Sequence, residues 1–135
     1  MDALNKKKRV YVVEDDIELS TVVDRVLKSI DQQISLDWST SAEEAIQTIH
    51  TAWKKGVRRP YDLIIVDVFL DGSQNGLDLW NLCKREYPDI PVVLTSSSRL
   101  GTLFPPGTEL PDTPIFLQKP FTMNESKNLF KNLLS

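Results

Sequence analysis

The segment LIIVDVFLDG, residues 63–72, gives the clearest indication of the fold. Its first four residues, Leu63 to Val66, are apolar and three of them are β-branched, which is typical of a strand buried on both faces of a parallel sheet. This strand runs directly into Asp67. Burying a carboxylate costs several kcal/mol unless the charge is paired or ligated. A neutralising partner for Asp67 must therefore be found elsewhere in the chain.

Four further short apolar segments alternate with helical patterns along the chain. Residues 10–13, 92–94 and 115–117 read as central strands, and residues 34–38 alternate as an edge strand would. Helical spacing covers residues 17–30, 42–55 and 77–87 and a last segment after Thr122, with capping boxes expected at Ser41 with Glu44 and at Thr122 with Glu125. The alternation predicts an α/β fold, a three-layer (βα)5 doubly wound sandwich around a parallel five-stranded sheet.

The fourth connection departs from this pattern. Residues 97–114 contain four prolines and two glycines. Because proline removes backbone donors, we expect the fourth helix to be short or irregular. The chain length of 135 residues predicts a single domain over residues 1–135.

Composition narrows the classes of function. The net charge of −3 argues against nucleic acid as a direct partner, and we expect the basic run Lys6 to Arg9 to be a solvated tail. No apolar stretch is long enough for a membrane span or a signal peptide, which predicts a cytoplasmic location. Cys83 is the only cysteine, so no internal disulfide forms, and its spacing with Leu79 predicts a core position.

Polar residues follow four of the five predicted strands. Ligands of open parallel sheets bind outside the carboxyl ends of the strands, so these residues are expected to converge. They are Glu14, Asp15 and Asp16 after the first strand, Asp67 after the third, Thr95 and Ser96 after the fourth, and Lys119 and Pro120 after the fifth. Asp16 has a simpler explanation as the N-cap of the following helix.

The charges of these residues indicate a chemistry. Glu14, Asp15 and Asp67 bring three negative charges and Lys119 brings one positive charge, so a divalent cation balances the site. Carboxylate ligands suit Mg²⁺ better than Zn²⁺. A carboxylate beside Mg²⁺ and lysine suggests phosphoryl transfer with Asp67 as the nucleophile. A hydroxyl at position 95 or 96 could then hydrogen-bond the phosphoryl group.

Taken together, four motifs resemble the receiver domain of two-component response regulators. They are VVEDD at 12–16, IVDVFL at 65–70, PVVLTSS at 91–97 and FLQKPF at 116–121, and the resemblance extends from about Arg9 to Leu134. It implies a flavodoxin-like strand order 2-1-3-4-5. Gly76 lies nine residues after Asp67 and Asp71 replaces the usual proline, as in a subgroup of single-domain and hybrid-kinase receivers.

The resemblance also implies a role for individual residues. Asp67 would be the phosphoacceptor and Lys119 its partner, with a cis peptide bond to Pro120. Asp15 would be the direct metal ligand and Glu14 would act mainly through water, while Asp67 and the backbone carbonyl of Phe69 would complete the protein ligands. Counting from Pro91 makes Ser96 the switch hydroxyl, with Thr95 as the alternative, and Phe116 the aromatic switch residue.

A receiver implies particular partners and excludes others. The donor would be a sensor histidine kinase or a phosphotransfer protein, and the output protein is unknown. We expect a monomer or weak dimer that does not bind nucleic acid or a membrane directly. The resemblance implies a signalling switch rather than an enzyme, although the domain would catalyse its own Mg²⁺-dependent phosphorylation. One alternative, a haloacid-dehalogenase-like phosphatase, needs a second aspartate where Phe69 stands. The other is a receiver-like interaction module that no longer accepts phosphate.

Overall fold

The structure is a computed structural model that describes residues 7–70, 75–98 and 114–135. Five parallel strands form one sheet in the order β2-β1-β3-β4-β5, which confirms the predicted fold and strand order. The elements are β1 Arg9–Val13, α1 Ile17–Ile30, β2 Ser35–Ser39, α2 Ala42–Lys54, β3 Leu63–Asp67, α3 Gly76–Glu86, β4 Val92–Ser96, β5 Ile115–Gln118 and α5 Met123–Leu134. The prediction of a short or irregular fourth helix concerns residues 97–114, most of which (99–113) lie outside the described residues.

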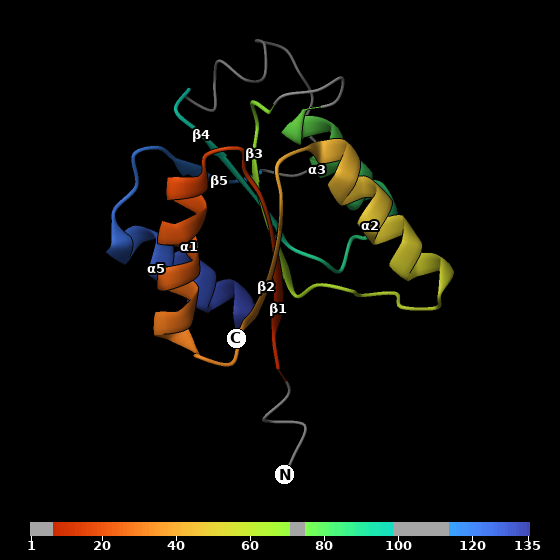
Figure 1. The fold of residues 1–135 in the computed structure, drawn as a ribbon, viewed down its shortest axis with the longest axis horizontal. Helices are drawn as coiled ribbons and strands as arrows, with labels where there is room; N and C mark the ends of the chain where they lie inside the picture. The colour runs from red at the N-terminus through yellow and green to blue at the C-terminus, as the bar shows by residue number, and fades with distance from the viewer. Residues whose placement is uncertain (1–6, 71–74, 99–113) are drawn as a thin grey trace.

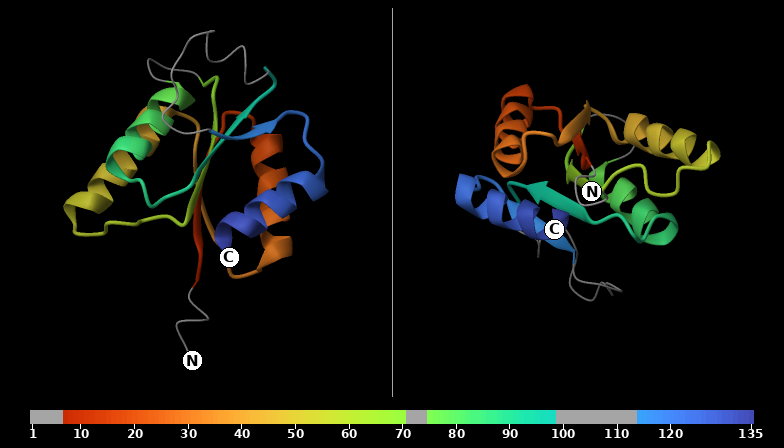
Figure 2. Two further views of the ribbon diagram at one scale, coloured as in Figure 1. Left: turned by 180° about the vertical axis from the view of Figure 1, so that it is seen from behind. Right: turned by 90° about the horizontal axis from the view of Figure 1, so that it is seen from below.

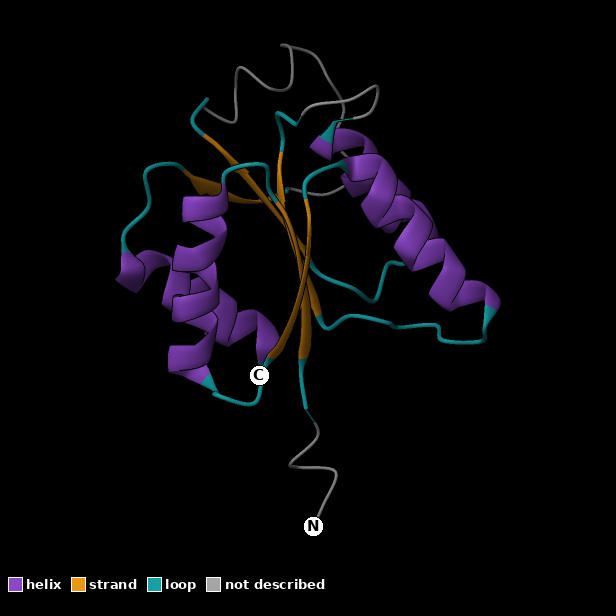
Figure 3. Cartoon of the chain, viewed as in Figure 1, coloured by secondary structure: helices purple, strands orange, loops and turns teal. Residues whose placement is uncertain are grey.

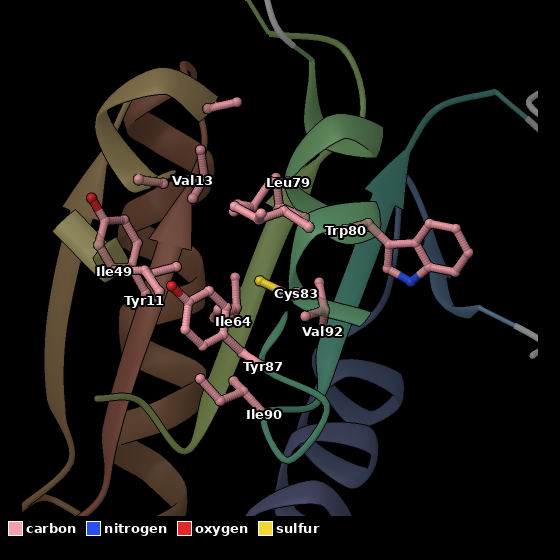
Figure 4. Close-up of a cluster of buried hydrophobic side chains, with 14 of the residues drawn as sticks. Tyr11, Val13, Ile49, Ile64, Leu79, Trp80, Cys83, Tyr87, Ile90 and Val92 are labelled. Atoms are coloured by element: carbon pink, nitrogen blue, oxygen red, sulfur yellow. The ribbon is translucent and has the colours of Figure 1, made fainter. Parts of the chain in front are cut away.

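The helices cover both faces of the sheet, so the molecule has three layers (Figures 1 and 3). Helices α1 and α5 lie side by side on one face, as both views of Figure 2 show, and α2 and α3 cover the other face. Alternate strand residues therefore point into two separate cores. The core beneath α2 and α3 contains Tyr11, Ile64, Cys83 and Val92 (Figure 4). Because both faces are covered, β3 and β4 are buried along their whole length, as their apolar sequences predict.

Side chains at the N-termini of the helices stop the helices from extending further. Asp16 accepts hydrogen bonds from two backbone N–H groups of α1, as expected of an N-cap. Thr122 and Glu125 form the predicted capping box of α5, whereas at α2 the bond found is from the Glu44 N–H to the Ser41 hydroxyl. A further capping box at α3, between Asn75 and Asp78, was not predicted, although the Asn-x-x-Asp spacing is visible in the sequence.

Two apolar side chains lie at the surface although helical spacing puts them in line with the apolar faces of their helices. Val22 of α1 is 40% exposed, and Trp53 in the last turns of α2 is 46% exposed. The ring of Trp53 meets the ring of the buried Tyr87 edge-on at 5.7 Å, so only part of its surface is covered. Within the part of the chain that the structure describes, no helix has the length and apolarity needed to cross a lipid bilayer.

Candidate functional site

Three charged side chains from distant parts of the chain meet at the carboxyl ends of the strands. Glu14 follows β1, Asp67 ends β3, and Lys119 follows β5. The Nζ atom of Lys119 lies 2.8 Å from Glu14 Oε1 and 3.0 Å from Asp67 Oδ2. Both carboxylates are almost completely buried, and the lysine side chain is 20% exposed. The lysine thus supplies the neutralising partner that the buried Asp67 requires.

Burial and charge shift the pKa values of this group. The pKa of Glu14 is raised to about 7, mainly because the carboxylate is removed from water. The hydrogen bond from Lys119 lowers this pKa and the Asp67 charge raises it, but burial outweighs the effect of the lysine. Burial acts to lower the pKa of Lys119, but its hydrogen bonds to Glu14 and Asp67 outweigh burial and raise that pKa above the ordinary value of a lysine. One ammonium group therefore serves two buried carboxylates, and the site still carries excess negative charge.

Asp15 adds a third carboxylate to the group. One carboxylate oxygen from each of Glu14, Asp15 and Asp67 lies within 4.8 Å of the others, a separation that a single metal ion can bridge. Asp15 is exposed, so the cluster is open to solvent on its side. A set of oxygen ligands with one open side fits Mg²⁺, which keeps water and phosphate in its coordination shell. This placement agrees with the three carboxylates predicted from the sequence.

The loop after β1 is held by bonds that fix the acidic residues. The N–H of Asp16 donates to Glu14 Oε2 at 3.2 Å. The indole Nε1 of Trp38, on β2, donates to the backbone carbonyl of Glu14 at 2.8 Å. Trp38 is not among the site residues predicted from the sequence. The contact depends on the pairing register of β1 and β2, which the sequence pattern alone does not give.

Gly76, the first residue of α3, lies very close to the backbone of Asp67. A Cβ atom built on Gly76 would lie 2.1 Å from the carbonyl oxygen of Asp67. The N–H of Gly76 donates to the Val68 carbonyl at 3.0 Å, and the N–H of Phe69 donates to Asp67 Oδ1 at 3.2 Å. Glycine at position 76 is therefore a steric requirement of the site. The use of the Phe69 carbonyl as a metal ligand stays a prediction.

The two hydroxyl candidates on β4 point to opposite faces of the sheet. Leu94 belongs to the core beneath α2 and α3, and Val93 to the core beneath α1 and α5. Strand alternation therefore places Ser96 on the side of Leu94 and Thr95 on the side of Val93. Phe116 packs against the same core as Leu94, so Ser96 and Phe116 share a face. The switch role assigned to Ser96 remains a prediction.

The predicted cis peptide bond between Lys119 and Pro120 is present.

Comparisons with known proteins agree with this geometry. The nitrogen assimilation regulatory protein NtrX of Azorhizobium caulinodans is 34% identical over 88 residues, which make up 64% of this chain but only 17% of NtrX. A response regulator of Chloroflexus aurantiacus has 24% identity and a TM-score of 0.74, covering 96% of this chain and 98% of its own. A receiver protein of Sinorhizobium medicae has 18% identity and a TM-score of 0.75, covering 96% and 95%.

At these identities the two solved structures establish the fold alone. The family is established by a match over residues 10–131 to the model of the response regulator receiver domain. That span includes the acidic loop, Asp67 and Lys119. The chain therefore belongs to the receiver domain family of response regulators.

Proposed function

We propose that this protein receives a phosphoryl group on Asp67 in a two-component His-Asp phosphorelay. The proposal rests on the position of Asp67 at the carboxyl end of β3. Its carboxylate lies 3.0 Å from Lys119 Nζ and close enough to the carboxylates of Glu14 and Asp15 for all three to bind one metal ion. In a chain of the receiver family, this arrangement supports a nucleophilic carboxylate over a purely structural one. The donor would be a phosphohistidine on a sensor kinase or a phosphotransfer protein.

The residues of the site have complementary tasks in this transfer. An oxygen of Asp67 attacks phosphorus, the P–O bond forms as the P–N bond to the donor imidazole breaks, and the imidazole leaves with the electron pair. Lys119 is placed to pair with a phosphoryl oxygen after releasing part of its contact with Asp67. Bound by Glu14, Asp15, Asp67 and the Phe69 carbonyl, Mg²⁺ would offset the charge of the transferring group.

The same proposal assigns the response to Ser96 and Phe116. The Ser96 hydroxyl accepts a 3.0 Å hydrogen bond from the N–H of Ser98, two residues after it. A phosphoryl oxygen on Asp67 would compete for that hydroxyl, and Phe116, half-buried on the same face, would follow. The output would then be a change in protein–protein contacts. It would take place in the cytoplasm, where histidine kinases that have been phosphorylated with ATP supply the phosphoryl group. The switch itself turns over no external substrate.

Labelling with acetyl phosphate and Mg²⁺ tests the proposal. We expect one phosphoryl group per chain by intact mass, lost in Asp67→Asn and retained in Asp89→Asn, a control on an exposed loop residue. Chelation of Mg²⁺ should also prevent labelling. Equal labelling of Asp67→Asn would place the acceptor elsewhere. A wild-type chain that resists both acetyl phosphate and a phosphorylated histidine donor would favour the interaction module that no longer accepts phosphate.

A further inference from the structure

A basic surface lies at the C-terminal end of α2 and in the loop that follows. We define it by the cations Lys54, Lys55, Arg58 and Arg59 together with the apolar side chains of Trp53 and Val57. All six residues are exposed, including 46% of Trp53 and 43% of Val57. No acidic residue interrupts the segment, although the whole chain has a net charge of −3. The basic surface is therefore positively charged, whereas the chain as a whole is negatively charged.

The four cations have no carboxylate partner in the described part of the chain. The ion pairs found there join other residues, such as Arg9 with Asp37 and Lys28 with Asp24. Arg58 instead places its guanidinium 6.0 Å from the centre of the Trp53 ring. Arginine stacked on an exposed aromatic ring retains its N–H donors for an external acceptor.

The backbone beneath this surface is fixed. Gly56 adopts a φ of +89°, its N–H donates to the Trp53 carbonyl at 2.9 Å, and the Val57 N–H donates to the Ala52 carbonyl at 3.0 Å. These two bonds form a Schellman motif, which ends the helix in one defined geometry. Pro60 and Tyr61 are buried immediately afterwards. A surface anchored at both ends loses little conformational entropy when a partner binds.

The helix dipole explains only part of this composition. Lysines in the last turn of a helix stabilise the partial negative charge of its C-terminus, which accounts for Lys54 and Lys55. Arg58 and Arg59 lie beyond the helix, and the dipole gives no reason for Trp53 and Val57 to face solvent. Exposed apolar side chains among arginines are typical of protein interfaces, where tryptophan and arginine dominate the binding energy.

We propose that the basic surface docks an acidic segment of a partner protein that carries an apolar side chain among its carboxylates. The carboxylates would pair with the four cations and the apolar side chain would cover Trp53 and Val57. A narrow peptide fits better than a flat anionic membrane or a duplex. The loop that carries Arg58 and Arg59 also carries Asp62, and Asp89 lies two residues after Tyr87, whose ring contacts Trp53, so an extended anionic surface would also meet these carboxylates.

The location of the basic surface leaves the phosphorylation site open. The loop between α2 and β3 runs along the end of the molecule where the strands begin, whereas Asp67 lies where β3 ends (Figure 1). A partner held at the basic surface could therefore remain bound while a donor reaches Asp67. This docking does not depend on the phosphorylation proposed above, because none of its residues belongs to the site.

The test uses the full chain and a short fluorescein-labelled peptide of glutamates and aspartates with one central phenylalanine. We expect anisotropy to show saturable binding at about 50 mM salt that weakens about tenfold at about 300 mM salt, as screened charge pairs require. Arg58→Glu with Arg59→Glu should weaken binding by at least about tenfold. Arg25→Glu with Lys127→Glu changes the net charge equally on the α1–α5 face and should leave binding unchanged within about twofold.

A second variant tests the apolar contact. Val57→Ser preserves every charge and should weaken peptide binding several-fold, while the indole N–H resonance of Trp53 should shift when the peptide binds to the wild-type chain. Three results would overturn the proposal. They are equal binding by the Arg58 and Arg59 double variant, no binding at low salt, and tighter binding to phosphatidylserine vesicles or to a DNA duplex than to the peptide.

Discussion

The edge strand β2 holds both backbone groups of Glu14. The indole Nε1 of Trp38 donates to the Glu14 carbonyl at 2.8 Å, and the Ser39 carbonyl accepts from the Glu14 N–H at 3.0 Å. Trp38 pairs in register with Val12, so its side chain reaches the residue that follows the end of β1. The position of the acidic loop is therefore determined by a strand that carries none of the charged residues of the site.

Trp38→Phe removes this donor and keeps a ring of similar shape. We expect the free energy of unfolding to fall by about 1 kcal/mol, the usual net contribution of one hydrogen bond. Amide hydrogen exchange at residues 14–16 should become faster in the metal-free protein, and Mg²⁺ should bind several-fold more weakly. Trp53→Phe, at an exposed ring, should change stability by less than about 0.5 kcal/mol. Unchanged exchange at residues 14–16 would show that Trp38 does not position Glu14.

Lys119→Met should destabilise the metal-free protein by about 2 to 4 kcal/mol, because it leaves two buried carboxylates without their shared cation. Urea denaturation with and without Mg²⁺ measures this effect. The stabilisation by Mg²⁺ should be larger in the variant than in the wild type, since the cluster is then more negative. Lys127→Met, which changes the same charge on α5, is the matched control. A variant as stable as the wild type would mean that the ion pairs contribute nothing net.

Alanine substitutions at two glycines should destabilise the protein for different reasons, a steric clash at Gly76 and backbone strain at Gly56. Gly76→Ala brings a Cβ to 2.1 Å from the Asp67 carbonyl oxygen, so the start of α3 or the backbone at Asp67 must shift. We expect a loss above about 3 kcal/mol together with weaker Mg²⁺ binding. Gly56→Ala meets no atom within 4 Å but must adopt a φ of +89°. Its cost should be about 1 kcal/mol, without an effect on Mg²⁺. Equal losses in the two variants would contradict this steric account.

The thiol of Cys83 should be chemically silent in the folded protein. It is 1% exposed within the core of Figure 4, and burial raises its pKa to about 12. The thiolate that reacts with disulfide reagents is therefore both rare and inaccessible. We expect no reaction with Ellman's reagent in native buffer and complete reaction in denaturant. Ser135→Cys adds an exposed thiol as a positive control, and rapid native labelling of wild-type Cys83 would count against a closed core.

Much of the fold and the site could be predicted from the sequence. Short β-branched segments alternating with helical spacing specify a parallel sheet, because only strands covered on both faces bury such segments completely. The carboxyl ends of all strands in a parallel sheet lie at the same edge. Residues that follow different strands in the sequence, such as Asp15, Asp67 and Lys119, are therefore expected to lie close together. The motifs around them then indicated the family.

The depth at which a side chain is buried and the register in which two strands pair could not be predicted from the sequence. Periodicity gives the face of a helix on which Trp53 lies but not how far the neighbouring elements extend over it, so its exposure could not be predicted. The bond from Trp38 to Glu14 joins residues 24 positions apart, and the bond from Lys119 to Glu14 joins residues 105 positions apart. Such contacts are set by strand pairing and side-chain packing, which a pattern read along a single chain does not contain.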